Sequence, residues 1–214
     1  KTGCLYFIDW AASVTESSEA GKFLGQLCAK DGSGNFKYAR KLIQFLKYYG
    51  IDGIGINPEG YWSSTLNENF SSFLAECHKV AKEENWPFHV DWYAFVSNSG
   101  GLSDNGCSLG IGENDKWFQK NGEPVTDVFF LNYNWGESQL IKSAEAAKSL
   151  GRSTFDVYAG FDQQGRGYGL KWSALMRQPV SVVVWGAHDR SQLYASSTEG
   201  GTSDLAIQKE YQTK

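Results

Sequence analysis

Asn57 and Glu59 are the residues of this chain whose types and spacing best suggest chemistry. They end an apolar run that is typical of a strand, and residues two apart on a strand project to the same face. Asn57 and Glu59 would therefore point together, while Ile54 and Ile56 would point to the opposite side. Pro58 stands between them and has no N–H to donate, which suits the end of a strand better than its middle.

A single carboxylate beside an amide does not suit a glycosidase that works with two carboxylates. The pair suits substrate-assisted hydrolysis, in which the 2-acetamido oxygen of a sugar attacks its own anomeric carbon. Glu59 would protonate the departing glycosidic oxygen and then deprotonate the incoming water. Asn57 would hold the acetamido group and stabilise the charge that forms on its nitrogen. The alternative is structural: both side chains cap the helix that follows.

Apolar runs alternate with helical patterns along the chain, which predicts βα units and a parallel sheet. We expect strands at 4–10, 53–59, 88–96, 127–135, 155–161 and 180–185, and helices at 38–49, 70–81, 140–150 and 172–176. Polar and aromatic residues stand at the ends of several of these strands, which is where a (β/α)8 barrel builds its active site. A doubly wound sheet would share this feature, but its Gly-rich phosphate turn is missing after the first strand.

The expected fold class is therefore α/β, a TIM-type (β/α)8 barrel. About six strands are expected, whereas a closed barrel has eight. We expect residues 1–214 to form one catalytic barrel domain that holds strands three to eight, with the first two βα units upstream of residue 1. The connection at 97–126 is long enough to suggest a functional role.

Three motifs at strand ends resemble glycoside hydrolase family 85, the endo-β-N-acetylglucosaminidases. The segment 49–59, YGIDGIGINPE, is similar to the family's fourth-strand pattern Y-G-F-D-G-W-x-x-N-x-E. FFLNYNW at 129–135 resembles its sixth-strand pattern, and DVYAGFD at 156–162, followed by GRG at 165–167, resembles a third. The likeness runs from about Cys4 to Trp185. It implies cleavage of the β-1,4 bond between the two core N-acetylglucosamines of N-linked glycans, with retention and no cofactor.

The resemblance also implies roles for individual residues. Glu59 matches the general acid/base, Asn57 the amide that orients the acetamido group, and Tyr93 the tyrosine that contacts this group. The other matched residues would bind substrate, as stacking platforms for sugar faces or as ligands of hydroxyl groups: Trp10, Trp92, Asn132, Tyr133, Trp135, Asp162 and Trp185. Each could instead be a core or structural residue. Ile54, Pro58 and the pair Ala94–Phe95 depart from the family's pattern and suggest a divergent glycan preference.

Two other functions remain open on these residues. A family 18 chitinase-like barrel is also substrate-assisted, but Gly55 and Asn57 replace two carboxylates of its D-G-x-D-x-D-x-E motif. A catalytically silent carbohydrate-binding barrel would keep the aromatic residues, although it would need neither Asn57 nor Glu59.

Composition excludes several partners. The chain has 24 acidic and 20 basic residues, a net charge of −4, which argues against nucleic acid. No apolar run approaches the ~20 residues of a membrane-spanning helix. The expected partners are an N-linked glycan or glycoprotein and the missing N-terminal part of the barrel. No metal is implied: the four cysteines are isolated and are expected to be buried thiols, with one or two disulfides as the alternative. His78 is expected on the solvent side of its helix. Secretion or the cell surface of a bacterium is expected, with the cytosol as the alternative.

Overall fold

A parallel β-sheet is the centre of the molecule. The computed structural model describes residues 4–9, 13–162 and 172–186. Its six-stranded sheet has the order β1-β2-β3-β6-β7-β8, and every neighbouring pair is parallel. The strands are β1 (Cys4–Asp9), β2 (Gly53–Pro58), β3 (His89–Tyr93), β6 (Val128–Leu131), β7 (Val157–Asp162) and β8 (Ser181–Trp185). The predicted parallel α/β architecture is confirmed, whereas closure into a barrel stays a prediction.

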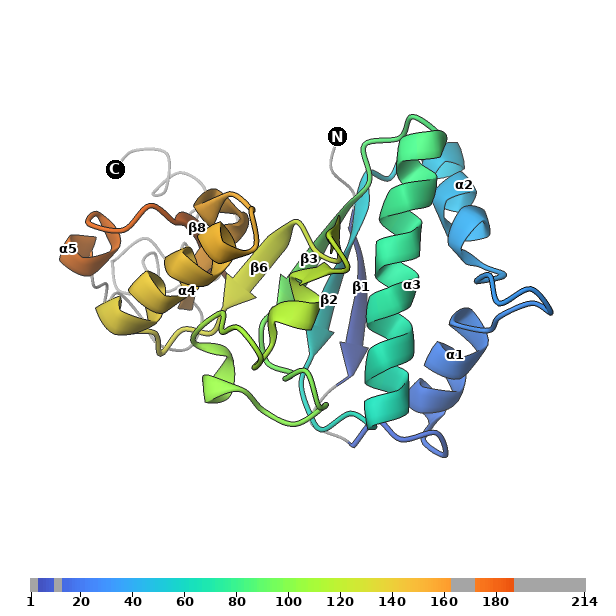
Figure 1. The fold of residues 1–214 in the computed structure, drawn as a ribbon, viewed down its shortest axis with the longest axis horizontal. Helices are drawn as coiled ribbons and strands as arrows, with labels where there is room; N and C mark the ends of the chain where they lie inside the picture. The colour runs from blue at the N-terminus through green and yellow to red at the C-terminus, as the bar shows by residue number, and fades with distance from the viewer. Residues whose placement is uncertain (1–3, 10–12, 163–171, 187–214) are drawn as a thin grey trace, which may run out of the picture.

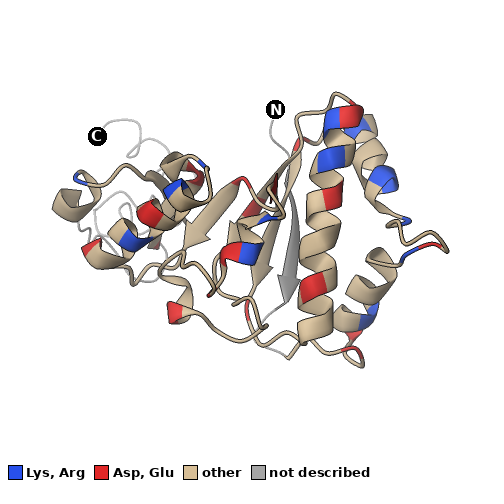
Figure 2. Ribbon diagram, viewed as in Figure 1, with Lys and Arg blue, Asp and Glu red and all other residues tan. Residues whose placement is uncertain are grey.

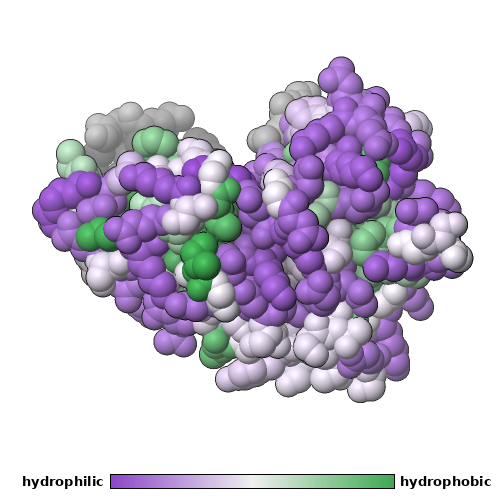
Figure 3. Space-filling view, in the orientation of Figure 1, coloured by the Kyte–Doolittle hydropathy of each residue, from purple (hydrophilic) through white to green (hydrophobic). Residues whose placement is uncertain are grey.

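Helices pack in front of this sheet in the view of Figure 1. They are α1 (Glu19–Leu27), α2 (Ala39–Tyr49), α3 (Ser64–Glu83), α4 (Glu137–Ser149) and the short α5 (Trp172–Leu175). The long helix α3 contacts both α1 and α2. Lys, Arg, Asp and Glu are interspersed along the outer faces of these helices (Figure 2), and this side of the molecule is predominantly hydrophilic (Figure 3). No helix in the described ranges is long and apolar enough to cross a membrane.

Local chemistry sets the ends of the helices. α2 ends at Gly50 with φ +67°, and Gly151 follows α4 with φ +71°, the left-handed conformation that glycine adopts without a steric penalty. Both helices end within one residue of the ends expected from the sequence, 49 and 150. α1 was not predicted, although Ser18 caps it by accepting a hydrogen bond from the Gly21 N–H at 3.0 Å. The segment 19–27 is mostly polar, so its few apolar residues were not recognised as one face of an amphipathic helix.

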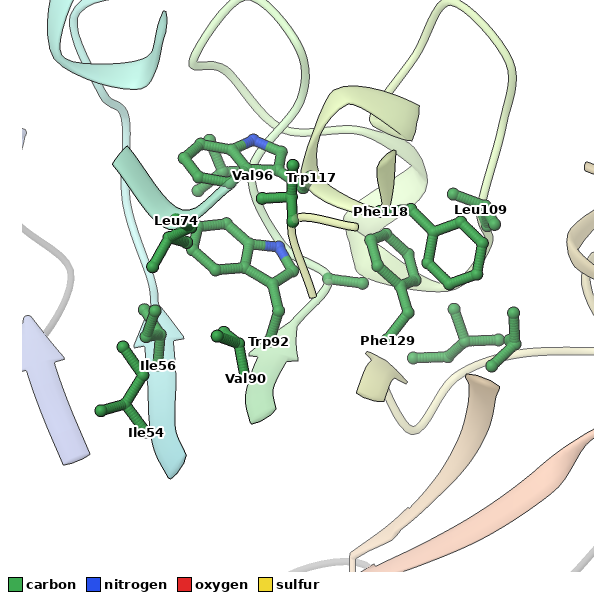
Figure 4. Packing of buried hydrophobic residues seen from close by; sticks show 14 of the residues in the cluster. Ile54, Ile56, Leu74, Val90, Trp92, Val96, Leu109, Trp117, Phe118 and Phe129 are labelled. Carbon is green, nitrogen blue, oxygen red and sulfur yellow. The ribbon is translucent and has the colours of Figure 1, made fainter. Parts of the chain in front are cut away.

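The core lies between the sheet and its helices. Ile54, Ile56, Val90 and Phe129 project from the strands into this layer and are buried. Trp92 projects the same way and stacks on Trp117, with ring centroids 3.9 Å apart (Figure 4). The predicted burial of the thiols is confirmed for Cys28, Cys77 and Cys107. The strand residues on the opposite face are mostly half-buried.

The connection between β3 and β6 contains no α-helix. It folds through two 3₁₀ turns, η1 (Asp104–Gly106) and η2 (Asp115–Trp117), and a hairpin of β4 (Gln119–Lys120) and β5 (Glu123–Pro124). A third 3₁₀ turn, η3 (Thr154–Asp156), precedes β7. Trp117 and Phe118 bury their rings completely against the outer face of the sheet. This connection therefore does the packing that a helix does in the other units.

Polar side chains fix that connection to its neighbours. Asn67 of α3 donates to the carbonyl oxygens of residues 97 and 98 at 3.2 and 2.8 Å. Arg152 donates to the carbonyl oxygens of Phe118 and Thr126 at 2.9 and 3.0 Å, and its guanidinium lies 4.2 Å from the Phe118 ring centre. These bonds satisfy the buried backbone of a segment without regular structure.

His78 corrects one expectation about α3. Its side chain is buried, not solvent-exposed, and Nε2 lies 3.4 Å from Oδ2 of Asp127. Burial lowers the pKa of His78, and the nearby Asp127 carboxylate only partly opposes this shift.

Candidate active site

A cavity of about 390 Å³ opens on the face of the sheet opposite the core layer. It lies between β2 and β8, where the strands end. Its lining combines three carboxylates with aromatic and apolar groups: Ile56, Asn57, Glu59, Asp91, Trp92, Tyr93, Val128, Phe130, Tyr133, Asp162, Val183, Val184 and Trp185. No Lys or Arg is among these lining residues. The cavity therefore suits a neutral ligand with flat apolar faces better than a phosphate.

Asn57 and Glu59 meet at this cavity, as the sequence predicts. Asn57 stands near the end of β2, and Glu59 follows just beyond Pro58. Asn57 Nδ2 donates to Glu59 Oε1 at 3.3 Å, and the Glu59 backbone N–H donates to the Asn57 carbonyl oxygen at 3.1 Å. The side-chain bond orients the amide and the carboxyl toward each other. The helix-capping alternative is wrong, because Ser63 caps α3 through the Leu66 N–H at 3.2 Å.

Tyr93 forms part of an aromatic wall. It ends β3, and its ring packs edge-on against Phe130 with centroids 5.3 Å apart. Tyr133 lies 6.2 Å from Tyr93 and 5.8 Å from Phe130, between centroids. Gly160 makes this wall possible, because a Cβ there would lie 2.5 Å from the Phe130 ring and 2.2 Å from the Leu131 carbonyl oxygen.

Asp162 and Trp185 form the opposite side of the cavity. They are direct partners in the register of β7 and β8 and both contribute to the lining. The Trp185 side chain is 40% exposed, so one of its faces remains available to a ligand. The sequence predicts both residues as substrate ligands, and their position is compatible with that role.

Three predicted substrate residues, Trp92, Trp135 and Asn132, are buried. Trp92 is 0% exposed, since it stacks on Trp117, and Trp135 is 2% exposed and donates from Nε1 to the Gly160 carbonyl oxygen at 2.8 Å. Neither ring offers a face to a sugar, so the prediction of stacking platforms is wrong for both.

Asn132 is also structural. Its Nδ2 donates to the Asn105 carbonyl oxygen at 2.6 Å, and its Oδ1 accepts from the Tyr133 N–H at 2.6 Å. These bonds hold the β3–β6 connection against the end of β6 and occupy the side chain expected to bind a hydroxyl group. Trp10, the remaining predicted platform, lies outside the described residues.

Six lining residues were not predicted, among them Asp91 and Phe130. Asp91 precedes Tyr93 by two positions on β3, and Phe130 is the register partner of Tyr93 on β6. The sequence indicated the position of Asp91, because residues two apart on a strand share a face and Tyr93 was already predicted at the site. The same rule places Trp92, between Asp91 and Tyr93, on the core side.

No cluster of three His, Cys, Asp or Glu side chains in the described part of the chain could hold a metal ion.

Comparison with curated proteins identifies relatives of one kind. The chain is 30% identical over 182 residues to cytosolic endo-beta-N-acetylglucosaminidase 2 of Arabidopsis thaliana, which covers 80% of this chain and 24% of the relative. It is 29% identical over 154 residues to the human cytosolic endo-beta-N-acetylglucosaminidase, covering 72% of this chain and 19% of the relative. The chain thus spans about a quarter or less of the length of these proteins.

A solved structure shares the fold. The crystal structure of the glycoside hydrolase domain of Endo-D from Streptococcus pneumoniae R6 aligns with a TM-score of 0.77 and 25% identity, over 97% of this chain and 32% of that chain. The profile of glycosyl hydrolase family 85 matches residues 10–199, nearly the whole sequence. With the Asn57 and Glu59 side chains in contact at a sugar-sized cavity, this match shows that the chain belongs to glycosyl hydrolase family 85.

Proposed function

We propose that the protein is an endo-β-N-acetylglucosaminidase that hydrolyses the GlcNAc-β-1,4-GlcNAc core bond of N-linked glycans with retention of configuration. The observation that carries this proposal is the contact between the Asn57 amide and the Glu59 carboxyl, 3.3 Å apart at the edge of the cavity. One carboxylate with an adjacent amide is the equipment for a reaction in which the substrate supplies the nucleophile.

The first step forms an oxazolinium ion. The acetamido carbonyl oxygen of the substrate attacks the anomeric carbon, forming one C–O bond, while the glycosidic C–O bond breaks. Glu59 gives its proton to the departing oxygen. Asn57 holds the acetamido group and stabilises the charge on its nitrogen. Tyr93 contacts the same group from the aromatic wall.

The second step consumes water. The Glu59 carboxylate takes a proton from a water molecule, whose oxygen attacks the anomeric carbon. The bond to the acetamido oxygen then breaks, and both the acetamido group and the Glu59 carboxylic acid are restored. Two inversions at one carbon give overall retention. Asp162 and Trp185 hold the sugar, the carboxylate through a hydroxyl group and the indole through its exposed face.

The surrounding architecture follows from the same proposal. The six parallel strands would be the third to eighth of a (β/α)8 barrel that the first two βα units complete, and residues 1–214 would belong to that single catalytic domain. The names of the curated relatives favour a cytosolic location over secretion.

The test is to incubate the full-length protein and its Glu59→Gln variant with a high-mannose glycoprotein, and to weigh the products by mass spectrometry. The wild type should leave one N-acetylglucosamine on each glycosylated asparagine, and the variant should lose nearly all release. Glu137→Gln, a carboxyl on the outer helix α4, is the matched control and should release glycan normally. A wild type that retains sugar on an affinity column but leaves the glycan intact would instead indicate a binding protein.

A further inference from the structure

The two residues that precede Asn57 on the same face of β2, Gly53 and Gly55, have no side chains. Gly53 and Gly55 are the register partners of His89 and Asp91 on the neighbouring strand. A Cβ at Gly53 would lie 2.2 Å from the His89 carbonyl oxygen and 3.1 Å from a carbon of the His89 ring. Gly53 therefore leaves room that His89 occupies, and Gly55 is opposite Asp91 in the register.

Asp91 is the charged group at the floor of the cavity. Its other neighbour in the register is Val128, and its side chain is 32% exposed. His89 Nε2 lies 3.5 Å from Asp91 Oδ1, so the imidazole supports the carboxylate from the side away from Tyr93. Because it alternates with Trp92, Asp91 points toward the cavity and contributes to its lining.

The register sets how far Asp91 lies from Asn57. Asp91 is opposite Gly55, and Asn57 is two residues further along the same strand. Parallel strands are about 4.8 Å apart and residues two apart on a strand are about 6.6 Å apart, which gives a diagonal of about 8 Å between the two Cα atoms. Both residues line the cavity, so the Asp91 carboxylate lies diagonally below Asn57, on the neighbouring strand.

We propose that Asp91 is a further electrostatic residue of the reaction, whose carboxylate stabilises the positive charge of the oxazolinium ion from below Asn57. This inference rests on the proposed function. A neutral amide can orient the acetamido group but brings no net charge to offset the cation. In a partly buried site, a fixed carboxylate interacts with a forming cation much more strongly than it would in water. Asp91 forms and breaks no bond: it acts on the step in which the ring closes.

The test compares two substrates in the full-length protein. One is a fluorescent high-mannose glycopeptide, whose cleavage requires the ring to form. The other is a synthetic glycan oxazoline, in which the ring already exists. Asp91→Asn, which keeps the shape and removes the charge, should lower kcat on the glycopeptide by about 100-fold with KM unchanged. It should lower oxazoline hydrolysis much less, and Asp91→Glu should restore part of the lost kcat.

Asp31→Asn is the matched control, because it removes the same charge from an exposed turn outside the cavity lining and should leave both rates unchanged. A rise in KM at constant kcat would make Asp91 a ground-state sugar ligand and overturn the proposal. Equal losses on both substrates, or a melting temperature lowered enough to explain them, would make its role structural and also overturn it. If wild type cleaves the glycopeptide and Asp91→Asn cleaves it equally well, only this inference fails. If wild type leaves it intact, the proposed function fails too.

Discussion

The sequence predicts both Trp92 and Trp185 as substrate-binding residues, but the structure places Trp92 in the core and Trp185 at the cavity. Trp92 is 0% exposed in the core, whereas Trp185 is 40% exposed at the cavity. Trp92→Phe removes about 40 Å³ of buried side chain, which costs about 1 kcal/mol for the cavity and about as much for lost transfer free energy. The free energy of unfolding should fall by about 2 kcal/mol, which lowers the melting temperature of a domain of this size by about 4–8 °C.

The assay is thermal unfolding followed by circular dichroism, with steady-state kinetics on the glycopeptide measured well below the transition. Trp92→Phe should lower the melting temperature and leave KM unchanged. Trp185→Phe should do the reverse, raising KM with little thermal effect. The reasoning would be refuted if Trp92→Phe kept the wild-type melting temperature and raised KM, because Trp92 would then contact substrate from a position the structure assigns to the core.

Three further predictions concern packing and charge. Gly160→Ala should destabilise the protein by about 2–3 kcal/mol and weaken substrate binding, because its Cβ would collide with backbone and with the Phe130 ring. Gly25→Ala in α1 has nothing within 4 Å of its Cβ and should instead stabilise the protein by about 0.5–1 kcal/mol. Urea denaturation measures both changes in stability. Arg152→Ala should lower the free energy of unfolding by about 2–4 kcal/mol, because it leaves buried carbonyl oxygens without donors. Arg177→Ala removes an exposed ion pair and should lower it much less, so equal losses in chemical denaturation would contradict this ranking. The lowered pKa of His78 means that the unfolded chain binds a proton more readily than the folded one, so stability should fall as pH drops from about 6.5 toward the folded-state pKa. His78→Gln should flatten that slope in melting temperatures measured from pH 7.5 to 5, and an unchanged slope would show that another group titrates.

Much of the fold was predictable because its signals are local. The ends of α2 and α4 need only a glycine after an amphipathic pattern, and they lie within one residue of the expected ends at 49 and 150. The strands after α3 and before α4 were predicted too long: residues 94–96 belong to the β3–β6 connection, and residues 132–135 belong to the turn before α4. How that connection packs depends on the contact between Trp92 and Trp117, which are 25 positions apart, and no local pattern shows it.

The site was predicted in part for a similar reason. Asn57, Glu59 and Tyr93 form strand-end motifs, and the structure places all three at the cavity. Trp92 and Trp135 were misplaced because an aromatic residue beside a motif can project to either side of its strand. Asp91 was overlooked because its place opposite Gly55 is set by the strand register, which is a property of the folded sheet.

The β3–β6 connection also bears on where this chain tolerates added sequence. Long connections are commonly the sites chosen for tags, domain insertions and new termini, but tolerance depends on the burial and hydrogen bonding of the backbone rather than on length. Here the longest connection carries fully buried Trp117 and Phe118 and is bonded to α3 and to Arg152. The short turn between α1 and α2 at Gly32–Gly34 is exposed, and a Cβ at either glycine would meet nothing within 4 Å. We therefore expect the turn at Gly32–Gly34 to tolerate an inserted reporter domain and the β3–β6 connection not to tolerate one.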